Sequence, residues 1–484
     1  MKRSELIREL RDITGPEGVI SEPEQLLTYE SDGLRNYRNT PVLVVLPSST
    51  EQVRGVVRLC HSLGIPVVPR GSGTGLSAGA LPVEGGIVLG LSRMREILEV
   101  DLANSRAVVQ AGVLNLWVTQ KVTQAGYYYA PDPSSQQVCS IGGNVAENSG
   151  GAHCLKYGFT VNHVTGLTVV LSDGEVVHLG GKAVEKPGYD LVGVFVGSEG
   201  TLGIATEITL RLVRKPEAVS TLLAAFESTD AAGGAVSGII AAGMVPAAIE
   251  MMDNLSIRAA EAAVHAQYPL DAGAILLVEL DGPRIEVEEQ MGQVEEICRG
   301  NGATSLRVAQ SDEERVLMWK GRKSAFAAMG RISPDYYVQD GVIPRTALPR
   351  VLREIADLGE RYGLRVANVF HAGDGNLHPL VLFDDSVPGQ AQQAEELAGD
   401  ILRACVSAGG SITGEHGVGL DKKRYMPYMF TTHDLDTMQM LRCAIDPDHT
   451  YNPGKLFPTP RMCGESPGRY RPHPVEQAGL GERM

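Results

Sequence analysis

The stretch VVPRGSGTGLSAGA, residues 67–80, decides how the first half of the chain is interpreted. Its spaced small residues formally match the glycine fingerprint of Rossmann units, in which backbone N–H groups hold a pyrophosphate at the start of a helix. A Rossmann unit needs a long helix directly after those glycines, and Pro82, Gly85 and Gly86 prevent one. The sequence therefore excludes a nicotinamide-binding unit of this kind.

The same stretch can still enclose a phosphate group. Three glycines at alternate positions allow successive backbone N–H groups to point at one anion. Two hydroxyl side chains lie between these glycines, and an arginine precedes them. The alternative for this segment alone is an ordinary surface turn. The predicted phosphate-binding residues are Arg70, Gly71, Ser72, Gly73, Thr74 and Gly75.

Two further glycine-rich elements follow along the chain. APDPSS and IGGNVAENSGG lie within residues 130–151, and VGSEGTLGI spans residues 196–204. Each brings small side chains and backbone amides together, so that a flat ring or a phosphate can approach the main chain closely. Three such elements are harder to explain as coincidence than one.

The composition limits the class of protein. A chain of 484 residues with 43% hydrophobic and 21% charged residues is expected to form two or three globular units. A formal net charge of −15 without a basic run argues against nucleic-acid binding. No apolar run reaches the ~18 to 20 residues of a membrane span, and the charged start MKRSELIREL is unlike a signal peptide. A cytoplasmic location is expected.

The chain changes character near Pro216. Before it, short β-like segments alternate with glycine-rich turns, and after it, strands alternate with full-length helices. This change predicts a second domain with an antiparallel sheet and helices on one face. The predicted units are 1–216, 217–425, 426–460 as a segment that returns to the first domain, and 461–484 as a loose tail.

Local signals predict individual elements in the first domain. Ser49 and Gln52 have the spacing of a capping box, which predicts a helix that ends at Gly64. A strand is predicted over residues 65–68. The Asp173-Gly174 pair predicts a β-hairpin.

Two histidines and an adjacent acid–histidine pair form a second candidate site. FHAGDGNLHP places His371 and His378 seven residues apart around a Gly-Asp-Gly turn, and GGSITGEHGVG adds Glu415 and His416. Each histidine taken alone is more simply explained as a hydrogen-bonded polar residue. Together, two neutral imidazoles and a carboxylate suit a borderline divalent cation such as zinc, with positions left open for a substrate.

The adjacent pair sets a condition on the backbone. Glu415 and His416 would point to opposite sides of an extended chain. A loop must therefore bring both to one site, and the flanking Gly414 and Gly417 permit such a loop.

The three glycine-rich blocks, in this order and at about this spacing, resemble the FAD-binding domain of the vanillyl-alcohol oxidase (PCMH-type) family. They are most similar to its glycolate-oxidase and D-lactate-dehydrogenase branch, and the resemblance covers about residues 20–460. It implies an α+β fold, with a PCMH-type FAD-binding domain of two small α+β subdomains and a ferredoxin-like α+β substrate (cap) domain. The flavin is expected between these two domains.

The resemblance also implies which residues hold FAD. Residues 70–77 would hold the pyrophosphate, the other two blocks would line the remainder, and NPGK would place Asn452 or Lys455 near the flavin. Covalently flavinylated relatives often carry a histidine in the first loop, and none lies between residues 70 and 80, so dissociable FAD is expected. The implied set is Arg70, Gly71, Ser72, Gly73, Thr74, Gly75, Ser77, Pro131, Ser135, Gly142, Gly143, Asn144, Asn148, Glu199, Gly200, Ile204 and Asn452.

The second site resembles that of the metal-dependent D-2-hydroxyacid dehydrogenases of the same branch. The matching positions make His371, His378 and Glu415 metal ligands, with zinc the expected ion, and His416 the catalytic base. A cation chelated by the hydroxyl and carboxylate of the substrate lowers the pKa of that hydroxyl. An imidazole that titrates near neutrality can then remove the proton as hydride moves to flavin N5.

The resemblance further suggests how a substrate carboxylate is recognised. WKGRKSAF, residues 319–326, matches the W-x-x-R helix of the family, which makes Arg322 the implied partner of that carboxylate. The alternative is a solvated helical arginine. Val338 and Leu380 replace a lysine and an asparagine that 2-hydroxyglutarate-type relatives carry. Both departures favour a smaller monocarboxylate.

The resemblance implies an FAD-dependent 2-hydroxyacid dehydrogenase that oxidises D-lactate or glycolate to the 2-oxo acid. Seven scattered cysteines lack the spacing of an iron–sulfur cluster, so the electrons are expected to leave to a separate acceptor other than oxygen. An iron–sulfur subunit, an electron-transferring flavoprotein, a cytochrome or a quinone would serve, and such a partner could hold the chain at the membrane periphery.

Three other functions remain open at this point. The first is a non-redox FAD enzyme of the alkylglycerone-phosphate synthase type. The second is a catalytically silent FAD subunit of a glycolate-oxidising complex. A metallohydrolase built on His371, His378 and Glu415 is a more distant third.

Overall fold

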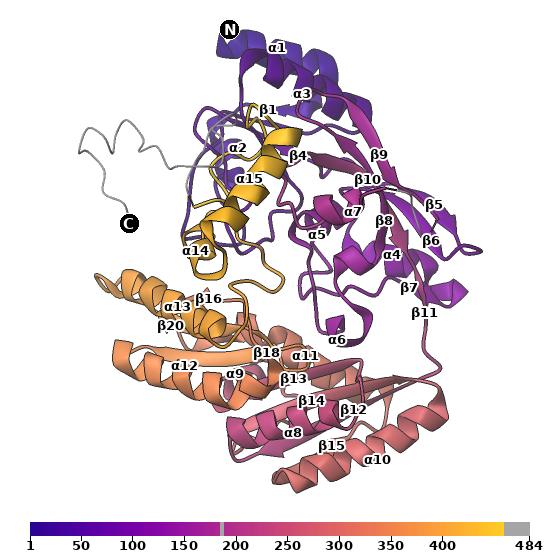
Figure 1. Cartoon of the computed structure of the whole chain (residues 1–484), viewed down its shortest axis with the longest axis vertical. Helices are drawn as coiled ribbons and strands as arrows, with labels where there is room; N and C mark the ends of the chain where they lie inside the picture. Colours follow the sequence, from indigo (N-terminus) through magenta and orange to yellow (C-terminus); the bar gives the residue numbers. More distant parts are fainter. Residues whose placement is uncertain (184–187, 459–484) are drawn as a thin grey trace.

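The computed structural model describes residues 1–183 and 188–458. The predicted loose tail, 461–484, lies outside these residues. Figure 1 shows an upper part that contains the N-terminal half and the C-terminal helices, and a lower part formed by the residues between them. Both parts combine helices with sheets, which confirms the predicted α+β class.

The upper part contains two main sheets. The first has the strand order β1-β2-β4-β3, in which β2, β4 and β3 are parallel. The second is antiparallel, with the order β5-β6-β10-β8-β9, and a separate pair joins β7 to β11. The strands are β1 (Val19–Ile20), β2 (Leu43–Val45), β3 (Val67–Arg70), β4 (Ile87–Gly90), β5 (Ile97–Asp101), β6 (Arg106–Gln110), β7 (Tyr127–Tyr128), β8 (Val164–Val170), β9 (Val176–Gly180), β10 (Ile204–Arg211) and β11 (Val213–Arg214).

Local capping fixes both ends of helix α3 (Thr50–Leu63). The Ser49 hydroxyl accepts a hydrogen bond from the Gln52 backbone N–H at 3.3 Å, and Gly64 ends the helix with φ +62°, as predicted. The β8–β9 hairpin turns at Gly174, with φ +82°, which confirms that prediction too. The helices are α1 (Arg3–Thr14), α2 (Pro23–Leu26), α3 (Thr50–Leu63), α4 (Asn115–Val122), α5 (Ile141–Glu147), α6 (Cys154–Tyr157) and α7 (Leu191–Phe195).

The lower part is built on one large antiparallel sheet. Its order is β15-β12-β14-β13-β18-β19-β17, and β20 joins β16 to β18. The strands are β12 (Ala218–Phe226), β13 (Ala248–Asp253), β14 (Ala274–Gly282), β15 (Ala303–Val308), β16 (Asp335–Val338), β17 (Gly341–Val342), β18 (Arg365–His371), β19 (Asn376–Leu377) and β20 (Pro379–Phe383).

Helices cover both faces of this sheet, so the prediction of helices on one face was wrong. Leu222 and Leu276 pack with α8, α10, α12 and α13, whereas Leu223 and Leu277 pack with α9 and α11. The strands are apolar at successive positions, and such strands need cover on each side. The helices are α8 (Thr229–Ala241), α9 (Asn254–Val264), α10 (Arg284–Gly300), α11 (Asp312–Ala328), α12 (Leu348–Tyr362) and α13 (Gln390–Ser407).

The last described segment returns to the upper part. It contains α14 (Met426–Met429) and α15 (Thr432–Ile445). Tyr451 then pairs in parallel with Val67 of β3, and the Val67 N–H donates to the Thr450 carbonyl at 2.8 Å. The segment therefore contacts the upper part, and β12 begins at Ala218, whereas the bounds of the unit 426–460 and the boundary near 216 remain predictions.

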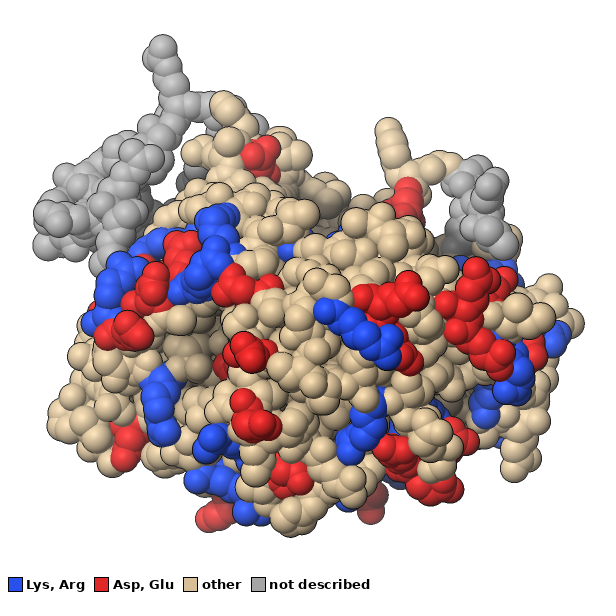
Figure 2. All heavy atoms as spheres, turned by 90° about the horizontal axis from the view of Figure 1, so that it is seen from below, with Lys and Arg blue, Asp and Glu red and all other residues tan. Residues whose placement is uncertain are grey.

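Figure 2 shows acidic and basic side chains interspersed over the face seen from below in Figure 1. Within the described ranges, no helix is both long and apolar enough to cross a membrane.

Candidate functional site

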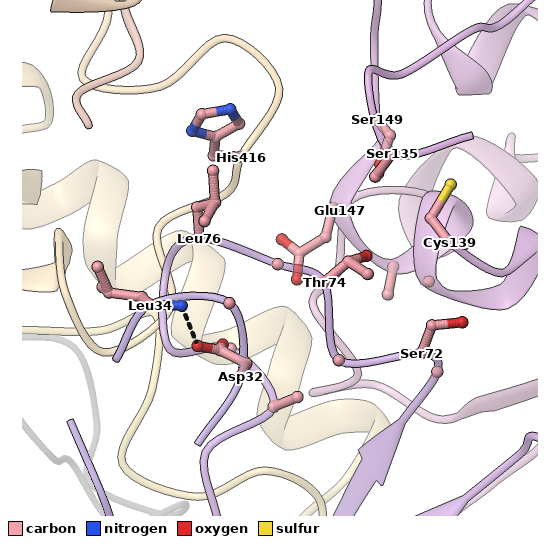
Figure 3. Close-up of a pocket in the computed structure, with 18 of the residues that line it drawn as sticks. Asp32, Leu34, Ser72, Thr74, Leu76, Ser135, Cys139, Glu147, Ser149 and His416 are labelled. Atoms are coloured by element: carbon pink, nitrogen blue, oxygen red, sulfur yellow. Dashed lines mark hydrogen bonds between the residues drawn. The ribbon is translucent and has the colours of Figure 1, made fainter. Parts of the chain in front are cut away.

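A cavity of about 670 Å³ lies where the two parts meet. Most of its wall comes from the three glycine-rich blocks. The lower part contributes Phe326, Tyr336 and His378, among others. In Figure 3, the loop with Ser72 and Thr74 and the imidazole of His416 lie on different sides of this space. One cavity therefore joins both sites that the sequence predicted.

The first glycine-rich loop presents main chain to the cavity. A Cβ atom at Gly71 would lie 2.4 Å from the Ser140 hydroxyl oxygen, and one at Gly73 would lie 2.2 Å from the Arg70 guanidinium. Gly73 also has φ +70°, which is strained for any residue with a side chain. Glycine is therefore required where this loop turns beneath Arg70 and passes the start of α5.

The second block forms the start of α5. The Ser140 hydroxyl caps this helix by accepting the Gly143 N–H at 3.3 Å. A Cβ atom at Gly142 would lie 2.7 Å from that of Ala111, so only glycine allows the helix to approach the end of β6 this closely. Gly142 and Gly143 line the cavity, which leaves the main chain of the first turn open to a bound group.

These features fit FAD. The cavity has the volume of a typical ligand site, and its glycine-rich loop and arginine are suited to a pyrophosphate. The predicted FAD residues that line it are Arg70, Gly71, Ser72, Gly73, Thr74, Gly75, Ser135, Gly142, Gly143, Asn144, Glu199, Gly200 and Ile204.

Four predicted FAD residues lie behind the cavity wall instead: Ser77, Pro131, Asn148 and Asn452. The Asn452 amide donates to the carbonyls of Gly79 and Glu199, at 2.9 and 2.8 Å, and so joins the first block to the third. The Ser77 carbonyl accepts the Leu420 N–H at 3.0 Å. Asn452 and Ser77 thereby connect segments of the wall, and none of the four residues lines the cavity.

Two carboxyl groups in the wall were missed by the sequence interpretation. Asp32 Oδ2 and Glu147 Oε2 are buried and have no hydrogen-bond partner among the described residues. Burial raises the pKa of Asp32 to about 6. Burial and the nearby Glu199 raise the pKa of Glu147 well above its usual value. Glu147 stood inside the second block, and an acid within a glycine-rich ligand loop was the available signal.

The predicted metal ligands meet on the side of the cavity that faces the lower part. His371 ends β18, His378 lies between β19 and β20, and Glu415 comes from the loop after α13. The Oε1 atom of Glu415 lies 3.4 Å from His371 Nε2 and 3.3 Å from His378 Nε2. One donor atom from each of the three lies within 4.8 Å of the other two. The structure thus brings together three residues that are distant in sequence.

This donor set fits a divalent cation. Both ring nitrogens of His378 and the Oε2 atom of Glu415 are buried without a hydrogen-bond partner among the residues described. Unpartnered buried polar atoms cost free energy, which coordination of an ion would recover. Two imidazoles and one carboxylate are typical of zinc sites that keep open positions.

His416 stacks on His378. The two rings lie 5.0 Å apart and are inclined by 6°. Burial lowers the pKa of His416 to about 4.

Asp340 organises the loop that carries Glu415 and His416. Its Oδ2 atom accepts the backbone N–H groups of Gly414 and His416 at 3.0 and 2.9 Å. Burial raises the pKa of Asp340, but His416 and Lys422 outweigh burial and hold it well below its usual value. The predicted loop is thereby confirmed. Asp340 also lies near His378 and His416 as a second possible ligand group, but its oxygens are already occupied by this loop.

Arg322 contacts a carboxylate of the protein. Its Nε atom donates to Glu250 at 2.7 Å, and the other oxygen of Glu250 lies 2.6 Å from His371 Nδ1. Burial raises the pKa of Glu250, but Arg322 and His371 outweigh burial and lower it. A carboxylate in this position orients a metal-binding histidine. Sequence reasoning missed Glu250, although an acid in the apolar strand AIEMMD was a signal.

Comparison with known proteins decides the family. Residues 41–180 match the FAD binding domain family, and residues 215–456 match the family of FAD linked oxidases, C-terminal domain. The chain belongs to the FAD-linked oxidases. This FAD-linked oxidase is 53% identical over 463 residues to the glycolate oxidase subunit GlcD of Escherichia coli, with 96% of this chain and 93% of the relative covered.

Other comparisons agree with this assignment. The FAD-linked oxidase is 32% identical to the D-lactate dehydrogenase of Anaerostipes hadrus, with 93% of this chain and 97% of the relative covered. Its fold is similar to that of p-cresol methylhydroxylase, with a TM-score of 0.78, 17% identity, and 94% and 96% of the two chains covered. The chain is therefore an FAD-dependent oxidoreductase with the predicted PCMH-type fold.

Proposed function

We propose that this FAD-linked oxidase oxidises a small D-2-hydroxy acid, D-lactate or glycolate, to the 2-oxo acid with the help of a divalent metal. The single observation that carries the proposal is the shared cavity. Gly71 to Gly75 line it on one side, and His378, Glu415 and His416 line it on the other. A substrate there would lie between a flavin and a metal centre.

His371, His378 and Glu415 would hold the metal, which is expected to be zinc. When bound, the metal supplies a Lewis acid for the hydroxyl and carboxylate of the substrate, and dissociable FAD supplies the hydride acceptor. Glu250 keeps His371 in place through the contact at its Nδ1 atom. Asp340 keeps Glu415 directed at the two histidines through its bonds to the loop.

His416 is the proposed base that takes the proton from the substrate hydroxyl. Its Nε2 atom lies 3.9 Å from Glu415 Oε1, next to the proposed ligands. An imidazole beside a cation-bound hydroxyl is suited to general base catalysis.

Arg322 is the proposed partner of the substrate carboxylate. Its contact with Glu250 ties it to the metal cluster, because Glu250 also contacts His371. Substitution by lysine would retain the charge and remove the planar fork. A raised KM in that variant, with metal content unchanged, would support the carboxylate role.

The uncharged side chains at Val338 and Leu380 favour a substrate without a second carboxylate. Val338 lines the cavity, and Leu380 lies opposite it in the β16–β20 pair, where it is fully buried in the sheet. Neither residue offers a charge to a second carboxylate. We therefore infer a monocarboxylate.

The electrons are proposed to leave to an acceptor other than oxygen. The name of the Escherichia coli relative describes a subunit of glycolate oxidase. By analogy, an iron–sulfur subunit, an electron-transferring flavoprotein, a cytochrome or a quinone would accept them, with the chain in the cytoplasm or held at the membrane by such a partner.

Anaerobic stopped-flow measurement of flavin absorbance tests the reaction. We expect D-lactate or glycolate to bleach the flavin quickly, and a chelator to slow the bleaching. L-lactate and D-2-hydroxyglutarate serve as comparison substrates. A flavoprotein that none of the four reduces would favour the non-redox synthase or the silent subunit, and a colourless protein would favour the metallohydrolase.

A further inference from the structure

A partly buried polar cluster lies outside the cavity, where α6 meets the large sheet of the lower part. Its centre is His153, which directly precedes α6 and follows the second glycine-rich block. Figure 1 shows α6 at the lower edge of the upper part, next to the strands of the lower part. None of the roles proposed above uses this cluster.

His153 joins a carboxylate from each domain. Its Nδ1 atom lies 2.9 Å from Asp132 Oδ2, and its Nε2 atom lies 3.0 Å from Glu279 Oε1. Ionised carboxylates only accept hydrogen bonds, so both ring nitrogens must donate, and the ring is an imidazolium. Burial alone would lower the pKa of His153, but the two carboxylates outweigh burial and raise it to about 10.

On one side, the cluster reaches the proposed flavin site. Asp132 belongs to the APDPSS segment, in which Pro133, Ser134 and Ser135 line the cavity. Its Oδ1 atom also accepts the backbone N–H of His153 at 3.3 Å. A Cβ atom at Gly151 would lie 2.5 Å from the Asp132 carbonyl. The start and the end of the second glycine-rich block, residues 130–151, therefore contact each other beside His153.

On the other side, the cluster reaches the proposed metal site. Glu279 Oε2 accepts the indole N–H of Trp319 at 2.6 Å, and Trp319 lies one turn before Arg322 on α11. The chain of contacts then runs from Arg322 through Glu250 to His371. The tryptophan of the W-x-x-R motif therefore has a role in this chain of contacts.

We infer that His153 is a positioning residue, which sets the distance between the flavin-binding loop and the metal and substrate centre. The inference rests on the proposed function, because the two sites it connects are those proposed above. Hydride transfer requires the reacting atoms to lie about 3 to 3.5 Å apart, and a shift of about 1 Å reduces the rate on the order of 100-fold.

Neighbouring cations do not duplicate this contact. Lys323 Nζ lies 3.7 Å from Asp132, and an Arg315 Nη atom lies 3.7 Å from Glu279. Each of these cations is in a salt bridge with only one of the two carboxylates, and their side chains are 37% and 28% exposed. Loss of the imidazolium would leave the partly buried Asp132 and the buried Glu279 facing each other as two anions, which repel.

The test compares His153→Gln with Lys156→Met in the full-length holoenzyme. Lys156 lies on α6, three residues after His153, and contacts Asp281 of β14, but it is outside the contacts that lead to Trp319. In His153→Gln we expect the flavin-reduction rate constant to fall roughly 10- to 100-fold, while the dissociation constants of FAD and substrate change less than about three-fold. In Lys156→Met we expect all three to stay within about three-fold of the wild type.

Equal losses in the two variants would overturn the inference. A loss of FAD or substrate affinity in proportion to the rate would do so as well, because it would indicate a general structural role. Glu279→Gln is the second variant, since it retains acceptors for Trp319 and Thr221 and removes one charge. It decides the question in the same way if His153→Gln does not fold.

A measurement without substrate separates this inference from the proposed function. The visible circular dichroism of bound FAD should change in His153→Gln and Glu279→Gln but not in Lys156→Met. If no hydroxy acid reduces the wild-type flavin, the proposed reaction fails, and the dichroism still decides whether His153 positions the cofactor. An unchanged spectrum in the first two variants would then reject the positioning role.

Discussion

The two sides of the central cavity are built in different ways. On the flavin side, glycines expose main chain, and the shape of the wall follows from close backbone contacts such as that of Gly142 with Ala111. On the metal side, imidazoles and a carboxylate line the wall together with apolar side chains, and further charged groups hold some of them. Glu250 contacts His371, and Asp340 holds the loop of Glu415.

This difference predicts different responses to mutation. A backbone site should tolerate changes in side-chain chemistry and respond to added volume. A site made of charged side chains should tolerate small changes in volume and respond strongly to loss of one charge or one donor atom. Substitutions on each side test this contrast.

The largest effect is expected at the proposed metal ligands. Glu415→Gln keeps the shape and removes the charge, so metal binding should be lost and flavin reduction should fall roughly 10⁴-fold, since a bound cation contributes several kcal/mol. Metal content by elemental analysis and stopped-flow reduction check this result. Glu288→Gln, at an exposed position of α10, is the control. Full metal content in Glu415→Gln would remove this residue from the ligand set.

A smaller loss is expected at the proposed base. His416→Asn should slow flavin reduction about 10²- to 10³-fold, as is usual when a general base is removed, and should leave the metal content near the wild-type value. His433→Asn, at an exposed position of α15, should have no effect. If metal is lost together with activity, His416 is a ligand rather than the base.

On the flavin side, added volume should matter most. Gly73→Ala places a side chain at φ +70°, which costs about 1 to 2 kcal/mol and should weaken FAD binding roughly ten-fold. Gly292→Ala, in an open position on helix α10, should not weaken FAD binding. Fluorescence titration of the apoprotein with FAD measures both values. Equal affinities would indicate that the loop adjusts freely.

The smallest effect concerns Asp32, which Figure 3 shows beside the Leu34 backbone N–H. Its folded pKa of about 6 lies above the unfolded value of 3.8, so the folded apoprotein binds more protons between these values. Its contribution to stability is therefore present below about pH 4 and is lost as pH rises towards 6, at about 1.4 kcal/mol per pH unit.

Asp32→Asn should remove this slope, because asparagine still accepts the Leu34 N–H but does not titrate. Denaturant unfolding of both apoproteins between pH 4 and 7 measures the difference. A variant that keeps the wild-type pH dependence would show that Asp32 ionises normally in the folded protein.

The sequence predicted features that depend on neighbours along the chain. The cap of α3 at Ser49, the hairpin at Gly174 and the glycine-rich blocks are local, and each has a recognisable residue pattern. The loop at Glu415 and His416 was also predicted, because two adjacent side chains can share a site only in a loop.

Features that depend on distant residues could not be predicted in this way. Glu250 and His371 meet because β13 pairs with β18, and no local pattern specifies that pairing. The second layer of helices on the cap sheet was missed for a similar reason, since a fully apolar strand does not reveal what covers each face. The contact of Arg322 with Glu250 likewise joins α11 to β13, and no local pattern predicts it.

The pairing of Tyr451 with Val67 has a consequence for biosynthesis. The ribosome makes β3 early and the Tyr451 segment last among the described residues, so the first sheet stays incomplete while the cap emerges. Domains generally fold as units during synthesis, and the cap can therefore form on the nascent chain before the upper part closes. FAD is then expected to bind the upper part after the Tyr451 segment has been made.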